Sequence, residues 1–125
     1  MSEPRIVMNA LATHLGRYAY RYGDEIQLHK RIAEVLTLYG FEFERERVLD
    51  ARNRADFWLD GVVIEVKVGG SLSSALHQVG RYIKLPDVTG VILAGTPRWA
   101  GEPLASEPEW LDKPFQMVRL ARQSL

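Results

Sequence analysis

The sequence predicts an α/β fold in which helices flank a mixed central β-sheet. Two segments with helical apolar spacing come first, three strand-like segments follow, and a further helix separates these from two more strands. A strand, a helix and another strand in this order favour a crossover between parallel strands. The 125 residues, of which 46% are hydrophobic, are enough for a single domain with its own core.

Two helices are predicted in the first third of the chain. Residues 6–22 carry apolar and aromatic side chains at helical spacing, and a second helix begins after the N-cap Asp24 and ends before Gly40. We interpret residues 1–23 as an N-terminal helical extension and residues 24–125 as the main part of the domain. The first helix either packs against its own domain or contacts nucleic acid or a second subunit.

Strands and one more helix account for most of the remaining chain. Residues 41–49 alternate apolar and charged side chains, which predicts a strand near a sheet edge. Asp60-Gly61 is a strong two-residue signal for a β-hairpin. The elements that follow from these signals are strands over 55–60 and 62–68, a helix over 72–84 capped at Ser71, an interior strand over 91–94, a loop-rich stretch over 97–114 and a strand over 115–120.

The composition limits the possible chemistry. With no cysteine, the chain has no disulfides, thiolate zinc sites or cysteine nucleophiles, so oxygen and imidazole ligands remain. Sixteen basic and 16 acidic residues cancel, so binding to nucleic acid needs a local basic surface. The chain has no apolar run of about 18 residues, and Glu3 and Pro4 do not fit a signal peptide, so we expect a cytoplasmic protein with no membrane partner. The histidines show no ligand spacing and are expected on the surface or in the core: His14, His29 and His77.

The predicted hairpin brings two acids together. If the strands fold back around Asp60-Gly61, Asp56 lies opposite Glu65, and both share one sheet face with Lys67. The other face is apolar and belongs to the core. Directly opposed carboxylates repel each other, so we expect a divalent cation between them.

Further groups are candidates to complete this cation site. Glu25 lies on the apolar side of the second helix and is either a third ligand or only an N-terminal capping charge. The main-chain carbonyl of Val66 is a further oxygen donor. Together with Asp56 and Glu65 these are hard oxygen ligands of the kind that Mg²⁺ or Mn²⁺ prefers.

This set of residues suits phosphodiester hydrolysis. A metal-bound water can act as the nucleophile because the cation lowers its pKa and orients it. Lys67 is placed to orient that water or to neutralise charge on the phosphate in the transition state. Gln78, on the third helix, either holds a water or a phosphate oxygen or is an ordinary boundary residue.

A local basic edge precedes the hairpin. Arg52 and Arg54 are expected either to contact a phosphate backbone or to be solvated next to neighbouring glutamates. Arg81 and Tyr82 of the third helix are assigned to the same nucleic-acid contact, although packing is the alternative for Tyr82.

These residues resemble the PD-(D/E)xK nuclease superfamily. The pattern reads Glu25, Ala55-Asp56, Glu65-Val66-Lys67, then Gln78 with Tyr82 four residues later, and it spans residues 24 to 95. The proline that names the motif is replaced by Ala55. The resemblance is to small stand-alone members, such as archaeal-type Holliday-junction resolvases and phage or restriction-linked nucleases. It implies a restriction-endonuclease-like core with the order α-β-β-β-α-β, preceded by an extra helix, and one- or two-metal cleavage of DNA, often by a homodimer.

Two other functions stay open. The first is a nucleic-acid-binding module on the same fold without turnover, and the second is a protein-interaction domain. In the second case Trp99, Trp110 and the proline-rich stretch 97–114 form an exposed partner surface. The sequence does not indicate whether the nucleic acid is duplex, single-stranded, branched or RNA.

Overall fold

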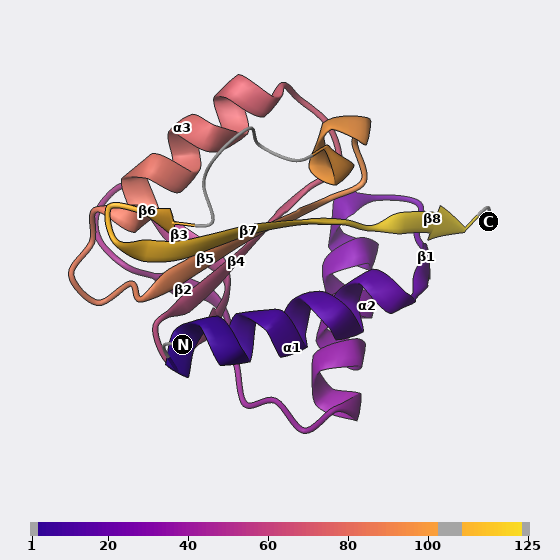
Figure 1. Cartoon of the computed structure of the whole chain (residues 1–125). Helices are drawn as coiled ribbons and strands as arrows, with labels where there is room; N and C mark the ends of the chain where they lie inside the picture. Colours follow the sequence, from indigo (N-terminus) through magenta and orange to yellow (C-terminus); the bar gives the residue numbers. More distant parts are fainter. Residues whose placement is uncertain (1–2, 103–108, 124–125) are drawn as a thin grey trace.

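A computed structural model describes residues 3–102 and 109–123 as an α/β structure with helices on both faces of a mixed sheet (Figure 1). The predicted α/β class, with a mixed sheet flanked by helices, is therefore confirmed. None of the helices in these two ranges is long and apolar enough to cross a membrane. The elements in chain order are α1 (Glu3–Arg17), β1 (Ala19–Arg21), α2 (Glu25–Leu38), β2 (Glu44–Val48), β3 (Arg54–Leu59), β4 (Val62–Lys67), α3 (Leu72–Ile83), β5 (Gly90–Gly95), the 3₁₀ helix η1 (Arg98–Gly101), β6 (Glu109–Trp110), β7 (Lys113–Arg119) and β8 (Ala121–Gln123).

The main sheet has the strand order β2-β3-β4-β5-β7-β6. Strand β3 pairs antiparallel with both β2 and β4, whereas β4, β5 and β7 run parallel to one another, and β6 pairs antiparallel with β7. The predicted parallel pairing of β4 and β5 across α3 is confirmed, and β2 is an edge strand as predicted. All six residues of β5 are buried, which agrees with the prediction of an interior strand.

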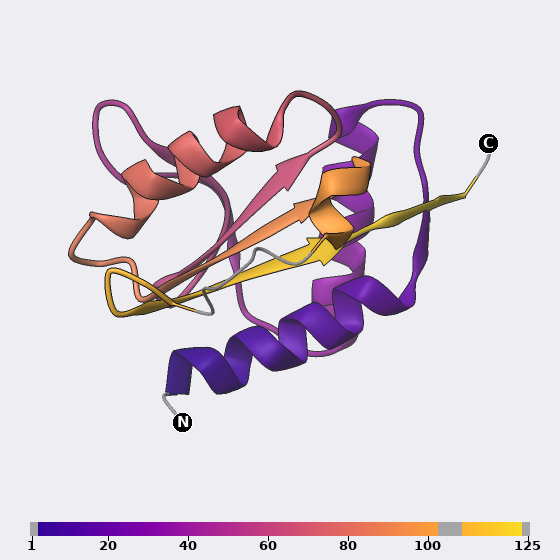
Figure 2. The same ribbon diagram turned by 45° about the horizontal axis from the view of Figure 1, so that its top comes forward.

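Two apolar cores lie on opposite faces of this sheet. Helices α1 and α2 pack on one face around side chains such as Leu11, Leu28 and Ile64, and α3 covers the other around Val63 and Val79 (Figure 2). The sequence predicts only one apolar hairpin face. That prediction is incomplete, because α3 buries the second face as well.

Local signals in the sequence determine where the helices begin and end. Asp24 caps α2, since its Oδ1 accepts a hydrogen bond of 2.8 Å from the main-chain N–H of Gln27. Gly40 follows the end of α2 with a φ of +78°, and the N–H of Phe41 bonds to the carbonyl of Leu36 at 3.0 Å. Phe41 takes part in this helix-ending motif and is not available for strand pairing. Strand β2 therefore begins at Glu44 and not at residue 41 as predicted.

The hairpin forms around the predicted turn. Asp60 and Gly61 both have positive φ angles, of 46° and 99°, which is the backbone of a tight hairpin turn that matches strand twist. Gly61 also lies close to Thr89, whose Oγ1 would be 2.7 Å from an added Cβ atom. The predicted register is confirmed for three pairs, namely Leu59 with Val62, Trp58 with Val63 and Phe57 with Ile64.

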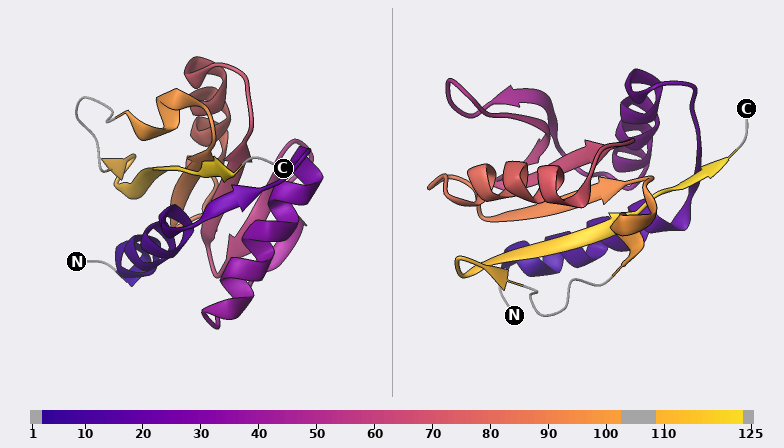
Figure 3. Two further views of the ribbon diagram at one scale, coloured as in Figure 1. Left: turned by 90° about the vertical axis from the view of Figure 1, so that its right-hand side faces the viewer. Right: turned by 90° about the horizontal axis from the view of Figure 1, so that it is seen from above.

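A second, two-stranded sheet was not predicted. Helix α1 ends at Arg17, and residues 19–21 form β1, which pairs in parallel with β8 (Figure 3). Tyr20 at its centre is buried, and its hydroxyl donates to the carbonyl of Leu15 at 2.7 Å. The helical prediction for 18–22 is wrong because pairing with a segment about 100 residues away overrides the local apolar spacing.

Candidate functional site

The candidate site lies where β3 and β4 separate. Within the described hairpin the ladder ends at the Phe57–Ile64 pair, and beyond it Oδ2 of Asp56 accepts a hydrogen bond of 2.8 Å from the N–H of Val66. The Asp56 carboxylate therefore occupies the place of a main-chain acceptor between the two strands. The predicted opposition of Asp56 and Glu65 as a regular cross-strand pair is wrong for this reason.

Glu65 is held by the helix above it. Its side chain is buried, with the residue only 3% exposed, and the Tyr82 hydroxyl donates to Oε1 at 2.9 Å. The amide nitrogen of Gln78 donates to Oε2 at 2.8 Å, and Nζ of Lys67 lies 3.7 Å from the same oxygen. The predicted proximity of Glu65, Lys67 and Gln78 is confirmed. Helix α3 thus covers this carboxylate and donates a hydrogen bond to each of its two oxygens.

Burial gives both acids unusual proton affinities. The pKa of Glu65 is raised from 4.5 to about 8, first by desolvation and then by the negative charge of Asp56, against the lowering effects of the Tyr82 hydroxyl and Lys67. Desolvation also raises the pKa of Asp56, against the lowering effects of the Val66 N–H and of His29. Because each of these carboxyl groups is hard to ionise, the site favours a bound proton or a nearby cation.

The two carboxylates have different partners. Glu65 engages α3, whereas Asp56 lies 3.8 Å from Nε2 of His29 on α2, and the Asp56 charge still acts on Glu65. Ala55 and Trp58 both belong to the core beneath α3, although they are three positions apart in a strand and should point to opposite faces. Regular alternation is therefore broken at Asp56, which turns its carboxylate toward α2.

His29 was not predicted as a site residue, yet it lies among three acids. Its side chain is 9% exposed, with Nε2 at 3.6 Å from Oε1 of Glu25 and Nδ1 at 3.9 Å from Oε1 of Glu46. Together with Asp56 these groups surround one imidazole. The Glu25–His29 spacing of four residues on α2 was the only signal in the sequence, and it is common on helix surfaces.

The position of Glu25 differs from the prediction. Its side chain is 52% exposed and lies 3.6 Å from His29, and its charge helps to raise the pKa of Asp56. Glu25 lies in the first turn of α2, where an acid also suits the helix dipole. A direct role of Glu25 as a ligand remains a prediction.

The predicted nucleic-acid contacts divide into exposed and buried residues. Arg52 is exposed, Nε of Arg54 lies 2.9 Å from Oε2 of Glu46, and Nε of Arg81 donates to the Asn53 side chain at 3.2 Å. All three guanidinium groups lie at the surface, and their contact with nucleic acid remains a prediction. For Tyr82 the predicted contact with nucleic acid is wrong, because the residue is 1% exposed and is hydrogen-bonded to Glu65.

The predicted tryptophan surface is largely internal. The Trp99 indole donates to the carbonyl of Gly70 at 3.1 Å, and the Trp110 ring packs edge-on against Phe115 at 5.9 Å. Both tryptophans are only partly exposed and join the core beneath α3. Of the proline-rich stretch, Pro103 and Pro108 lie outside the described residues.

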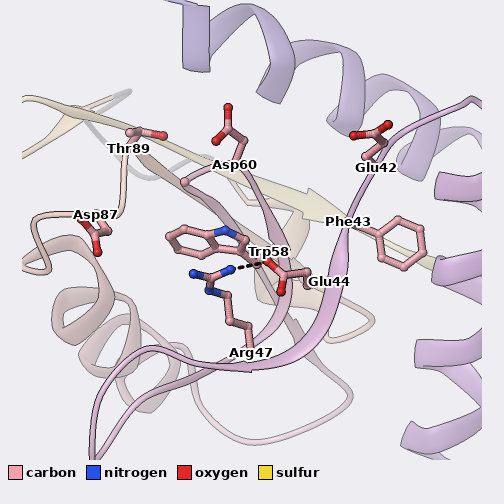
Figure 4. A pocket seen from close by; sticks show the side chains of 9 residues that line it. Glu42, Phe43, Glu44, Arg47, Trp58, Asp60, Asp87 and Thr89 are labelled. Carbon is pink, nitrogen blue, oxygen red and sulfur yellow. Dashed lines mark hydrogen bonds and ion pairs between the residues drawn. The ribbon is translucent and has the colours of Figure 1, made fainter.

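An open cleft of about 830 Å³ lies at the other end of the hairpin, near its turn. Acidic side chains of Glu42, Glu44, Asp60 and Asp87 line it, and the Arg47 guanidinium covers the Trp58 ring at 4.7 Å (Figure 4). None of the predicted site residues lines this cleft. The candidate chemistry therefore belongs to the Asp56 end of the hairpin and not to this hollow.

The donors at the Asp56 end fit a divalent cation. Carboxylate oxygens of Asp56 and Glu46 and one nitrogen of His29 lie within 4.8 Å of one another, and Glu65 and Lys67 follow on the α3 side. Oxygen and imidazole donors are the ligands of such ions in proteins that lack thiolates. Comparisons of this chain with protein-family descriptions, with curated proteins and with solved structures found no match.

Proposed function

We propose that this protein is a metal-dependent nuclease that hydrolyses phosphodiester bonds in DNA. The observation that carries the proposal is a pair of acids with raised pKa values, the partly buried Asp56 and the buried Glu65, with the ammonium group of Lys67 beside Glu65. Such a group of acids and one lysine fits a divalent cation and a phosphate. The element order α2-β2-β3-β4-α3-β5 supports a restriction-endonuclease-like core.

In this proposal each side chain has a distinct task. Asp56, Glu65 and the main-chain carbonyl of Val66 hold Mg²⁺ or Mn²⁺, which when bound supplies a water of lowered pKa and neutralises phosphate charge. Lys67, whose side chain is partly exposed, faces the phosphate and stabilises the charge that develops on it. Gln78 and Tyr82 keep the Glu65 carboxylate in place through their hydrogen bonds to its two oxygens.

The surface around the site supports a polyanionic substrate. Arg52 lies in the turn before β3, Arg54 begins β3 and Arg81 lies on α3, and all three are exposed. Because the overall charge is zero, such a local basic edge is what a phosphate backbone requires. A homodimer would place two such edges along one duplex.

Cleavage assays test the proposal directly. Labelled linear, flapped and four-way DNAs are incubated with Mg²⁺, Mn²⁺ or chelator, using the wild type and the variants Lys67→Ala and Asp56→Asn. We expect metal-dependent cleavage that falls by about 100-fold or more in both variants. Lys84→Ala, at the exposed end of α3, is the matched control and should cleave like the wild type.

Circular dichroism of each variant confirms that it is folded before its activity is compared. Cleavage of equal rate in the wild type, Lys67→Ala and Asp56→Asn would contradict the assignment of the site. Inactivity of the folded wild type on every DNA with both metals would contradict the nuclease function itself.

A further inference from the structure

His29 has a buried nitrogen without a hydrogen-bond partner. Its ring packs against Phe57, with the centroids 5.8 Å apart, and its side chain is more than nine-tenths buried. Nε2 makes no hydrogen bond, although carboxylate oxygens of Asp56 and Glu25 lie 3.8 and 3.6 Å away. A buried nitrogen that has lost its hydrogen bonds to water destabilises the fold unless another group replaces them, so this position favours a bound partner.

Carboxylate oxygens of three acids lie within 4 Å of this imidazole. We propose that His29, Glu46 and Asp56 bind a first-row transition-metal ion, for which Mn²⁺ is the probe. This inference deepens the proposed function and rests on it in part, because Asp56 belongs to both sets of ligands. It names the class of metal and adds two ligands that sequence reasoning did not find.

The distances fit metal ligation. One donor atom from each of the three residues lies within 4.8 Å of the other two. Nε2 of His29 lies 3.8 Å from Asp56, whereas Glu46 lies 3.9 Å from Nδ1, so only one of these two nitrogens would bind the ion. Ligands at about 2.1 Å from an ion lie about 3.0 Å apart when adjacent in an octahedron and about 4.2 Å apart when opposite. Small side-chain movements are therefore enough to close the site.

The three ligands come from three different elements. His29 lies on α2, Glu46 on the edge strand β2 and Asp56 on β3, so the ion would join a helix to two strands. Arg54 binds Oε2 of Glu46 at 2.9 Å, which holds this carboxylate with Oε1 toward His29. Glu46 also has a φ of +54°, a backbone conformation that is unusual outside glycine.

The ligand chemistry selects the class of ion. Mg²⁺ prefers a complete set of oxygen ligands, whereas an imidazole nitrogen suits first-row transition metals. The competing explanation is that a protonated His29 is itself the cation among Glu25, Glu46 and Asp56. These two explanations differ in one measurable respect, because only the first makes the affinity for Mn²⁺ depend on His29.

Calorimetric titration of chelator-treated protein with Mn²⁺ and with Mg²⁺ tests the proposal, with the electron paramagnetic resonance spectrum of bound Mn²⁺ as a second readout. We expect Mn²⁺ to bind about ten-fold or more tightly than Mg²⁺, and His29→Ala and Glu46→Gln each to weaken Mn²⁺ binding by about ten-fold or more. Glu46→Gln is the safer variant for folding because the residue lies on an exposed edge strand. His77→Ala, an exposed histidine on α3, should bind Mn²⁺ like the wild type.

The outcomes separate this inference from the proposed function. Equal Mn²⁺ affinity in the wild type, His29→Ala and Glu46→Gln would overturn the metal site, whatever the nuclease assay shows. Mn²⁺ binding that depends on His29 and Glu46 would support it, even if no DNA is cleaved. Lys67→Ala should retain Mn²⁺ binding while it loses cleavage, because its ammonium group is not a ligand.

Discussion

Replacement of Glu65 by glutamine should change how the stability of the protein depends on pH. The folded protein holds this carboxyl with a pKa of about 8, compared with an ordinary value of 4.5, because of burial and the nearby Asp56 charge. Between these two pH values the folded state binds more protons at Glu65 than the unfolded chain does. The free energy of unfolding therefore falls as the pH rises through this interval.

The size of the effect follows from the same two values. At about 1.4 kcal/mol for each pH unit, the interval from 4.5 to about 8 corresponds to a loss of at most about 5 kcal/mol in the metal-free protein. The contribution is fully present below pH 4.5 and is gone above about pH 8. Glutamine cannot ionise, so Glu65→Gln should lack this decline.

The glutamine variant keeps most of the local contacts. Its carbonyl oxygen can still accept from the Tyr82 hydroxyl, and the Gln78 amide can turn so that its oxygen accepts from the new amide nitrogen. We therefore expect Glu65→Gln to be within about 1 kcal/mol of the wild type at pH 4.5 and clearly more stable at pH 8.

Urea unfolding at a series of pH values, in the presence of chelator, measures this difference. Glu34→Gln is the control, since Glu34 is an exposed acid of α2 that pairs with Arg31 at 2.7 Å. Its stability should stay within about 0.5 kcal/mol of the wild type at every pH. If the wild-type and Glu65→Gln curves run parallel from pH 4.5 to 8, the argument from burial is refuted.

Two further variants test the contacts around the site and the turn of the hairpin. Tyr82→Phe removes the hydroxyl that donates to Glu65, which should lower the free energy of unfolding by about 1 to 3 kcal/mol and raise the pKa of Glu65 further, as measured by the same pH series. Gly61→Ala should destabilise the protein by about 1 to 3 kcal/mol in thermal unfolding, because φ is +99° and the new Cβ would meet Thr89. Gly69→Ala, with no heavy atom within 4 Å of the added Cβ, should change the melting temperature little, and equal shifts in the two glycine variants would contradict this account.

Features encoded by short segments could be predicted from the sequence. The turn at Asp60-Gly61 determines the pairing of the residues next to it, and the caps at Asp24 and Ser71 determine where two helices begin. These features depend on contacts between residues a few positions apart. The alternation of side chains then places Glu65 and Lys67 correctly on the side covered by α3.

The remaining features depend on contacts between distant segments. The hairpin rule applies only while the two strands stay paired, and it fails at Asp56, whose carboxylate takes over a main-chain hydrogen bond. His29 becomes part of the site because α2 packs beside β3. Its four-residue spacing from Glu25 on the helix does not predict this packing. The burial of Tyr82 likewise follows from the way α3 lies on the sheet.

The small parallel sheet of β1 and β8 connects distant parts of the chain with the start of α2. Arg122 of β8 donates to the carbonyl of Tyr22 at 3.0 Å and lies over its ring at 4.5 Å, two residues before the cap of the helix that carries His29. A substitution in β8 would therefore shift the His29 imidazole by changing the orientation of α2, without altering any of the acids around it. Substitutions near residue 122 belong in any search for variants that alter metal affinity from a distance.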